Sequence, residues 1–526
     1  MSGLACRLVC CALALLAAGS VSGQHARDVP RYSAATQGKF LEAERLFRSA
    51  NYAASLALYE ELAERYPEAP PAHVGLAASA SRLGDHAQAA DAYLAAVHLL
   101  PEDATLEGEL ADSSRSAKRY VDAEKWYRRA IADETTGEGR TRWHVGLGLI
   151  DSDAGRFAEA VAHYRDALVE DPDSSVARHD LGVALLNMND LVEADAAFVR
   201  VLVTDPSNAR ALFARGKIAA RNGDRGRAAD LYSAAAELEP DEPTFHHAHG
   251  QTLRRLGDWD GAAAALDRYR ATKAALYRAK GRDAMVKGRW VDAQASFTKA
   301  VETDPQDIDS LADRAYCLLK SGESENARRG YEAVLAARPD SPRAMYHLGV
   351  ALYHLGRHDD AEDRLLDLID RSPDFPESYR QLAWVRRAKG DITGAEGAFS
   401  MGLARNDKWA PGYWWRGGVR RQLGDEVGAE ADLRRSIQLT PDAPFPRESL
   451  ARLLLETGGD LDEALAHAQV AATKTPSPMH RTTLALVYHA LGRSDDATRE
   501  IQRAYGDAPS DTRVLTARRL ITGGVK

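Results

Sequence analysis

A small residue returns about every 34 positions along this chain, and that repeat constrains the fold more than any other feature. The clearest mark of the repeat is a Gly-Asp or Gly-Arg turn, found in most units, then an aromatic or apolar residue, then the small residue that opens a second helix. The small residues are Ser55, Ala89, Ala123, Ala160, Ala194, Ala228, Ala262, Ala293, Ala327, Ala361, Ala395, Ala429, Ala464 and Ala497. We therefore predict fourteen units over roughly residues 36–510, since 526 residues exceed what one compact core usually serves.

Prolines mark the ends of most units, because a residue without an N–H whose ring clashes with the preceding turn cannot continue a helix. The closing prolines are Pro67, Pro101, Pro172, Pro206, Pro240, Pro305, Pro339, Pro373, Pro441, Pro476 and Pro509.

Within one unit, residues 178–206, the apolar positions recur at helical spacing. Gly182 lies on one face of the first helix, and Ala194 and Phe198 lie on one face of the second. Gly182 and Ala194 are small because two helix backbones must approach closely there, and we expect Phe198 to fill the space that they leave.

This pattern resembles the tetratricopeptide repeat, over about nine-tenths of the chain. The resemblance implies an all-α, right-handed superhelical solenoid of about fourteen helix-turn-helix repeats, with the first helices lining a concave wall. It says much less about function, because this family binds many unrelated partners.

Three irregularities bear on the domain organisation. Residues 135–139 replace a closing proline and predict a longer exposed loop, and the unit ending near Asp407 also lacks its proline. Between Ala262 and Lys280 there is neither glycine nor proline, so a second helix is expected to run into the next unit. We predict a signal peptide (1–23), a linker (24–35), two seven-repeat halves (36–273 and 274–510), and a capping helix and tail (511–526).

The signal peptide is predicted from one positive charge, Arg7, before an apolar run over residues 8–18 and small residues through Gly23. That run is shorter than the roughly 20 residues that span a bilayer, and no later stretch is apolar enough. Cleavage would leave Cys317 as the single cysteine, so no intramolecular disulfide is expected. We expect a periplasmic or secreted protein; a lumenal eukaryotic protein is the alternative.

Charged and aromatic side chains form a stripe along the predicted inner face of the first helices, which we call the inner stripe. Its members are Arg210, Phe213, Lys217, Arg221, His247, Gln251, Arg254, Arg255, Arg278, Arg282, Tyr316, Lys320, Arg343, Tyr346, Tyr353, Arg380, Trp384, Arg387, Trp414 and Arg421. Twelve of these are lysine or arginine, and only Asp309 and Glu377 stand against them, although the whole chain has a net charge of −9. The inner stripe therefore predicts a ligand-binding groove for an anionic or carboxylate-bearing partner.

A structural interpretation of the same stripe stays open. Arginines on helices often solvate a face or pair with acids of the adjacent helix, and tryptophans often pack between repeats. Trp384 and Trp414 fit either role, whereas Trp126, Trp143, Trp259 and Trp290 are expected to pack. The corresponding stripe of the first four units is mixed in charge and predicts no site.

Catalytic machinery is not indicated. No metalloprotease, nucleophile-elbow or phosphate-loop motif occurs, and the repeats leave no space for an enzyme domain. The histidine cluster His246, His247 and His249 lacks further ligands at metal spacing, so no metal and no cofactor is expected. Cys317 is expected to be a packed residue.

We thus expect a non-catalytic cell-envelope scaffold that binds a partner protein or an acidic peptide segment. The alternative is a periplasmic component of exopolysaccharide export or assembly that binds an anionic polymer. The acidic balance offers no electrostatic footprint for nucleic acid.

Overall fold

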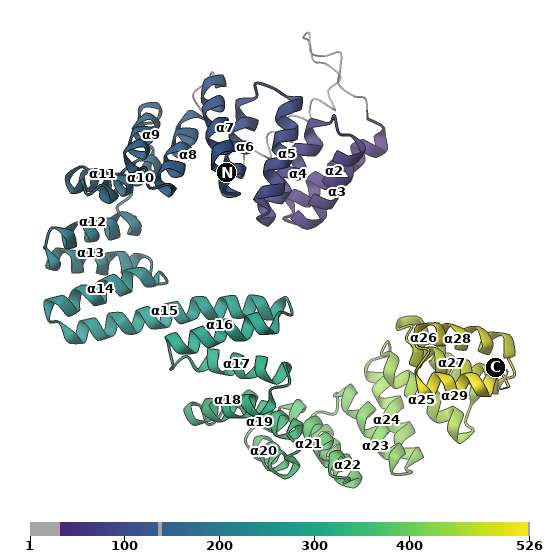
Figure 1. Cartoon of the computed structure of the whole chain (residues 1–526). Coiled ribbons are helices and arrows are strands. Elements are labelled where there is room, and N and C mark those ends of the chain that lie inside the picture. Colours follow the sequence, from purple (N-terminus) through teal and green to yellow (C-terminus); the bar gives the residue numbers. More distant parts are fainter. Residues whose placement is uncertain (1–31, 135–138, 524–526) are drawn as a thin grey trace. The chain divides into compact units, whose positions relative to one another are not determined.

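The computed structural model describes residues 32–134 and 139–523, which form 28 helices and contain no strand. Figure 1 shows successive helices arranged as antiparallel neighbours. The predicted signal peptide and the predicted loop at residues 135–138 lie outside the described residues. No helix in the described part of the chain is long and apolar enough to cross a membrane.

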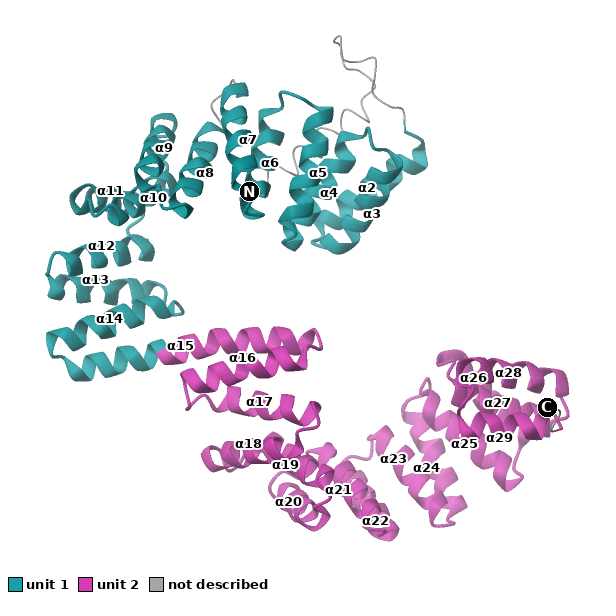
Figure 2. Cartoon of the chain, viewed as in Figure 1, with its two compact units in different colours: residues 1–269 teal, residues 270–526 magenta. Residues whose placement is uncertain are grey.

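Two compact units divide the chain after Tyr269 (Figure 2). The helices of unit 1 are α2 (Ala34–Arg48), α3 (Tyr52–Arg65), α4 (Pro70–Leu83), α5 (His86–Leu99), α6 (Ala104–Ser116), α7 (Tyr120–Asp133), α8 (Arg140–Asp153), α9 (Phe157–Glu170), α10 (Ser175–Asn187), α11 (Leu191–Thr204), α12 (Ala209–Arg221), α13 (Arg225–Leu238) and α14 (Pro243–Leu256). The division falls within α15 (Trp259–Val286).

Unit 2 continues with α16 (Trp290–Thr303), α17 (Ile308–Lys320), α18 (Ser324–Ala337), α19 (Pro342–His354), α20 (His358–Arg371), α21 (Pro376–Ala388), α22 (Ile392–Arg405), α23 (Ala410–Gln422), α24 (Glu426–Leu439), α25 (Pro444–Thr457), α26 (Leu461–Lys474), α27 (Pro478–Ala490), α28 (Ser494–Asp507) and α29 (Thr512–Ile521). The all-α, tetratricopeptide-type fold predicted from the repeat is confirmed.

Each hairpin packs through the small residues that define the repeat. All fourteen of them are buried, from Ser55 at 0% exposure to Ala262 at 3%. In the fifth hairpin, a Cβ built on Gly182 would stand 2.8 Å from Cζ of Phe198, which confirms the predicted close approach. Every closing proline lies two positions beyond the last residue of the helix that it ends. For example, α3 ends at Arg65 and is followed by Pro67.

The turn between the two helices of a repeat needs a residue in the left-handed region of backbone conformation. Gly257 (φ +85°) and Gly390 (φ +84°) adopt it without strain, which explains the recurrent turn glycine. Where aspartate follows, it caps the second helix: Asp391 Oδ1 accepts a hydrogen bond from the Gly394 N–H at 2.7 Å. The Gly-Arg turns, such as that before α20, lack a side-chain cap.

The helix α15 confirms the expectation that one helix runs into the next repeat. It spans 28 residues and serves as the second helix of one hairpin and the first helix of the next. The predicted junction between seven-repeat halves at residue 273 stays a prediction. Trp259, expected to pack, is 66% exposed at the first turn of α15, so that expectation is wrong. Because Trp259 is the first residue of α15, its side chain lies outside the hairpin interface.

The last helix, α29, contacts α27 and α28 and buries Val514 and Ala517. Its arginines Arg513 and Arg519 are exposed, and the predicted role of residues 511–526 as a polar cap and tail stays a prediction.

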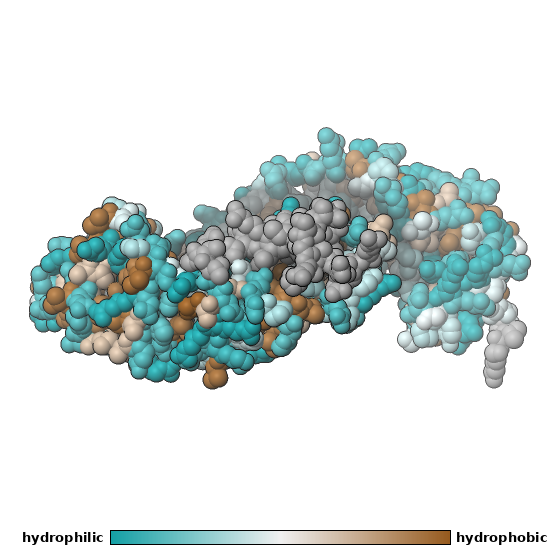
Figure 3. Space-filling view, turned by 90° about the horizontal axis from the view of Figure 1, so that it is seen from above, coloured by the Kyte–Doolittle hydropathy of each residue, from teal (hydrophilic) through white to brown (hydrophobic). Residues whose placement is uncertain are grey.

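Exposed large hydrophobic residues occur on many helices of the described chain. On the face shown in Figure 3 they lie in small groups separated by hydrophilic ones. Several exposed valines, such as Val121, Val192 and Val427, occupy the second position of a second helix. Such isolated residues do not indicate an apolar docking patch.

Candidate first-helix binding surface

Several pairs of first helices from consecutive repeats contact one another, whereas among the described residues no pair of second helices makes a comparable contact. In unit 1, α10 contacts α8 and α12; in unit 2, α19 contacts α17 and α21. The repeats are therefore packed more closely on the first-helix side within each unit. The inner stripe lies on this side, with one part in unit 1 and another in unit 2.

In unit 1 the stripe begins on α12. Phe213 is buried, with its ring centroid 4.7 Å from that of Phe245, so this ring belongs to the core and is not an open stacking platform. Lys217 extends over it, with Nζ 4.5 Å from the ring centroid. Burial, and then the charge of Arg221, lower the pKa of Lys217. Arg221 donates to the Leu186 carbonyl oxygen at 2.6 Å.

The α14 part of the stripe is a short polar chain. The His247 ring lies 4.8 Å from that of Tyr269, and the amide of Gln251 lies between His247 and Arg254. Arg254 donates to Gln251 Oε1 at 2.8 Å, and Arg255 is exposed. Arg210, Lys217, Arg221, Arg254 and Arg255 form no ion pair with any residue in the described ranges.

Three cations of the unit 2 stripe are neutralised by acids of the next repeat. Arg278 Nη1 lies 2.6 Å from Asp307 Oδ1, and Arg282 Nε lies 2.9 Å from Asp313 Oδ2. Arg421 Nη1 lies 2.5 Å from Glu456 Oε2. The expectation that only Asp309 and Glu377 oppose the cations is thus wrong, since it compared residues on one helix and not across repeats. Asp309 itself pairs with Arg338, 2.6 Å away.

The remaining cations of unit 2 gather on α17, α19 and α21. Lys320, Arg343 and Arg387 are exposed, and among the described residues none of them has an ion-pair partner. Arg380 donates to Tyr346 Oη at 3.0 Å and lies 5.4 Å from the centroid of a Trp415 ring. We call Lys320, Arg343, Arg380 and Arg387 the unpaired cations.

Aromatic rings adjoin three of these side chains. Lys320 Nζ lies 5.4 Å from the Tyr316 ring centroid, and the Arg387 guanidinium lies 5.0 Å from that of Trp384. Trp384 is half-buried and meets Phe399 edge-on, so its ring is both packed and partly open. These cation–π contacts orient the charges and leave their N–H donors available.

His347, which the sequence analysis did not single out, lies among the rings of this cluster. Its ring centroid is 5.3 Å from Tyr316, 5.4 Å from Tyr331 and 5.1 Å from Tyr346. Burial lowers its pKa to about 4, with further lowering by the positive charges of Arg343 and Lys320. Its position beside Tyr346 and one repeat after Tyr316 was the available sequence signal.

Two other aromatic members of the stripe, Trp414 and Tyr353, pack on neighbouring side chains. Trp414 donates from Nε1 to Ser449 Oγ at 3.0 Å, and its ring lies 5.6 Å from Phe445. Tyr353 adjoins the rings of His354 and His358. These contacts fit the structural interpretation of the two residues.

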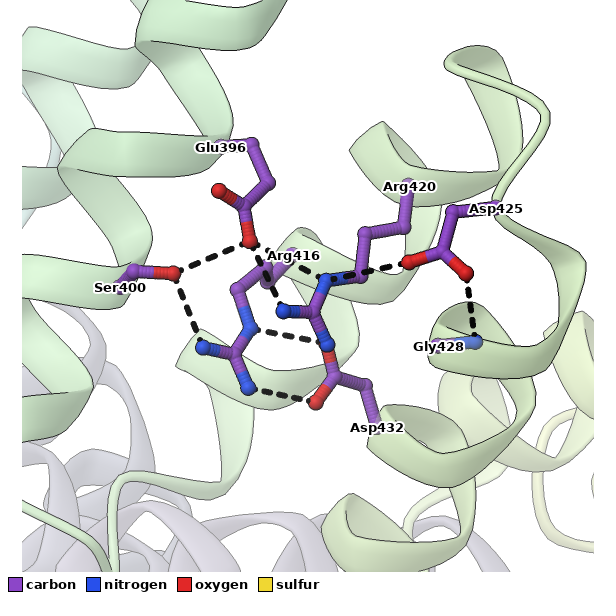
Figure 4. Close-up of polar contacts among 7 residues, drawn as sticks. All are labelled: Glu396, Ser400, Arg416, Arg420, Asp425, Gly428 and Asp432. Atoms are coloured by element: carbon purple, nitrogen blue, oxygen red, sulfur yellow. Dashed lines mark hydrogen bonds and ion pairs between the residues drawn. The ribbon is translucent and has the colours of Figure 1, made fainter.

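Cations that face the second helices have a different role, as Figure 4 shows. Arg416 and Arg420 of α23 point toward α22 and α24 and bind Asp432 and Glu396, with Arg416 Nη2 2.7 Å from Asp432 Oδ1. Ser400 accepts a hydrogen bond from Arg416 Nη1 at 2.9 Å. These arginines hold the hairpins together and are not available to a ligand.

Cys317 and His246, which lie outside the inner stripe, are both buried. Cys317 is fully buried, and burial raises the pKa of its thiol to about 11, so it is a packed residue as expected. His246 is buried and its Nε2 lies 2.8 Å from the Pro240 carbonyl oxygen.

A cavity of about 400 Å³ lies among α25, α27 and α29. The sequence analysis did not predict this cavity, and its wall includes the buried Glu448.

Three family models described as the tetratricopeptide repeat match this chain, and together they cover more than half of it. The matched residues are 40–104, 76–138, 247–308, 278–330 and 312–376 for one model, 152–218 for the second and 478–503 for the third. The chain belongs to the tetratricopeptide repeat family.

Two curated relatives are similar over part of their length. The chain is 22% identical to DnaJ homolog subfamily C member 3 of Rattus norvegicus over 253 residues, 48% of this chain and 47% of that one. It is 27% identical to cellulose synthase operon protein C of Xanthomonas axonopodis pv. citri over 371 residues, 62% of this chain and 24% of that one. The chain thus spans about half of the first relative and a quarter of the second.

Among solved structures, a tetratricopeptide repeat protein from Parabacteroides merdae is 16% identical, with a TM-score of 0.38, over 48% of this chain and 99% of that one. The APC/C hetero-tetramer Cut9-Hcn1 contains a chain that is 18% identical, with a TM-score of 0.34, over 93% of this chain and 90% of that one.

Proposed function

We propose that this chain is a non-catalytic scaffold whose unpaired cations on α17, α19 and α21 hold an acidic peptide segment of a partner protein. The observation that carries the proposal is that Lys320, Arg343 and Arg387 are exposed in an acidic chain and have no acidic partner among the described residues. Lys320 and Arg387 also lie beside aromatic rings.

The charges suit a carboxylate because a guanidinium presents its N–H groups as a planar fork that can bind two oxygens. Arg343 and Arg387 retain this capacity. Three other arginines of the stripe do not, because each is already paired with an acidic side chain: Arg278 with Asp307, Arg282 with Asp313 and Arg421 with Glu456. Tyr316 and Trp384 offer ring faces beside the charges, so an acidic segment with apolar or aromatic residues fits best.

An anionic polysaccharide is the second candidate. It is favoured by the sequence similarity to cellulose synthase operon protein C, which extends over 62% of this chain. The half-buried Trp384 ring also offers a surface for a sugar. Both candidates agree with export to the periplasm, which we propose from residues 1–23. Amino-terminal sequencing of the exported chain should then begin near Gln24, and an intact Met1 would contradict export by this signal.

The test compares ligand binding by the wild-type chain and by an Arg343→Ala/Arg387→Ala variant. Fluorescence anisotropy would use a labelled Glu-rich peptide, the matching Gln peptide, and alginate as competitor. The variant should bind the acidic peptide about tenfold more weakly per lost contact, because a charge-assisted hydrogen bond contributes about 1.5 kcal/mol or more. Affinity should also fall as salt rises from about 0.05 to about 0.5 M.

The matched control is Arg364→Ala, which removes the same charge from an exposed position on the second helix α20. It should bind as the wild type does. Equal weakening by the control, or binding of the Gln peptide with equal affinity, would contradict the proposal. Preferential binding of alginate would select the polysaccharide.

A further inference from the structure

A cluster of metal-ligating side chains lies in the fourth hairpin, outside the inner stripe. His144 is on α8, and His163 and Asp166 follow each other at i and i+3 on one face of α9. One ligand atom of each residue lies within 4.8 Å of the others, in the one such group of three among the described residues. The two imidazole rings are 6.3 Å apart between centroids.

Both histidines carry a ring nitrogen without a partner. Nδ1 of His144 and Nδ1 of His163 are buried, and neither has a hydrogen bond to any described residue. A buried polar atom without a partner costs about 1–3 kcal/mol, so an occupant that bonds to these two nitrogens would be stabilising.

The other ring nitrogen of His163, Nε2, faces the carboxylate of Asp151. This atom lies 3.5 Å from Asp151 Oδ2, and Arg156 fixes that carboxylate through hydrogen bonds of 2.6 and 2.8 Å to Oδ1. A carboxylate behind a histidine orients the ring and raises its basicity in many metal sites.

We propose that His144, His163 and Asp166 form a binding site for a divalent transition metal, with Zn²⁺ as the favoured ion. Two imidazoles and one carboxylate suit Zn²⁺, whereas Mg²⁺ and Ca²⁺ prefer oxygen ligands. Tetrahedral bonds of about 2.0–2.1 Å place ligand atoms about 3.4 Å apart. Rotation of the exposed Asp166 side chain and small ring movements bring the ligands together, and solvent fills the fourth position.

The neighbouring carboxylate is already engaged. Glu170, one turn after Asp166, pairs with Arg140, whose Nε lies 3.1 Å from Glu170 Oε1. The site therefore has three protein ligands, and a bound ion would link the two helices of one repeat. It is independent of the inner stripe.

Cobalt and zinc titrations test the site on the untagged mature chain after removal of metals. We expect one equivalent of Co²⁺ to give visible d–d absorption that Zn²⁺ abolishes, and Zn²⁺ to raise the melting temperature. His144→Ala and His163→Gln should each raise the Kd for Zn²⁺ by about a hundredfold, and Asp166→Asn by about tenfold.

The control is His249→Ala, which alters a partly buried histidine on a first helix of the same unit. It should bind Zn²⁺ as the wild type does. Circular dichroism without metal identifies any variant that fails to fold, and either histidine substitution alone suffices for the test. No binding by the wild-type chain at about 0.1 mM metal, or binding that both folded histidine variants retain in full, would overturn the proposal.

Discussion

Arg416 binds Asp432 through two parallel hydrogen bonds that join the helices of one repeat, α23 and α24. Nε lies 2.8 Å from Oδ2 and Nη2 lies 2.7 Å from Oδ1, and the Asp432 side chain is only 5% exposed. Arg420 Nη1 also reaches this carboxylate, at 3.1 Å. Asp432, together with Glu396, which lies 2.9 Å from Arg420 Nη2, thus balances two guanidinium groups that would otherwise repel each other.

Replacing Asp432 with Asn should destabilise the α23–α24 hairpin by about 3 kcal/mol, because it leaves two partly buried cations with less compensation. Hydrogen exchange of α23 and α24 measures the effect locally, which suits a repeat array that need not unfold in one step. Asp360→Asn breaks the exposed pair with Arg357 and should cost less than about 1 kcal/mol. Equal costs for the two variants would refute the structural role of Asp432.

The approach of Gly182 to Phe198 predicts a steric penalty. Gly182→Ala would place a methyl group 2.8 Å from Cζ of a fully buried ring and should destabilise the fifth hairpin by about 1–3 kcal/mol. Thermal unfolding and hydrogen exchange of α10 and α11 check this. Adding Phe198→Leu should relieve part of the loss, whereas Gly397→Ala, which meets open space on α22, should stabilise slightly.

Glu107 should make stability depend on pH. Burial raises its pKa from 4.5 to about 7, opposed by Arg129, whose Nε lies 2.7 Å from Oε1, and reinforced by Asp133 and Asp103. The folded state therefore holds a proton that the unfolded state has released between these pH values. The stabilising contribution is complete below pH 4.5 and is lost as the pH rises through about 7.

Glu107→Gln should remove this dependence while keeping the side chain's shape. Hydrogen exchange of α6 and α7 between pH 4.5 and 8 should show the wild type losing protection relative to the variant as pH rises. A constant difference across the range would mean that Glu107 does not titrate there.

His347 reports the field of the unpaired cations. Its pKa of about 4 results from burial and then from Arg343 and Lys320, so Arg343→Gln should raise that pKa. A bound acidic peptide should raise it too. An NMR titration of the ring protons measures the shift, with Arg364→Gln as the control. An unchanged pKa in Arg343→Gln would show that Arg343 does not contribute to the lowered pKa of His347.

Much of the fold was readable from the chain itself. The packing of a hairpin can be predicted from residues that are close in sequence. Ala194 and Phe198 lie on one helix, and Gly182, some sixteen residues before Phe198, lies across a short turn. The continuous helix α15 followed from the absence of helix breakers, and the presence of the short helix α29 from the pattern of residues 511–520. Trp259 was misplaced because helical spacing does not reveal how far a helix start protrudes.

The binding surface was readable only in part. Periodicity selected the helix face that bears Lys320, Arg343 and Arg387, but it also included Phe213, which is buried, and Arg278, Arg282 and Arg421, which are neutralised. The neutralising acids come from the following repeat, beyond the reach of a pattern within one helix.

The sequence by itself determined the repeat, its helical hairpins and the small residues at which they meet, because these depend on contacts within a few turns of chain. Only the tertiary structure decided which cations find an acid, that His347 sits among tyrosines, and that His144 faces His163 and Asp166. Those outcomes depend on side-chain conformations and on contacts between helices. Neither the spacing nor the composition of the sequence specifies them.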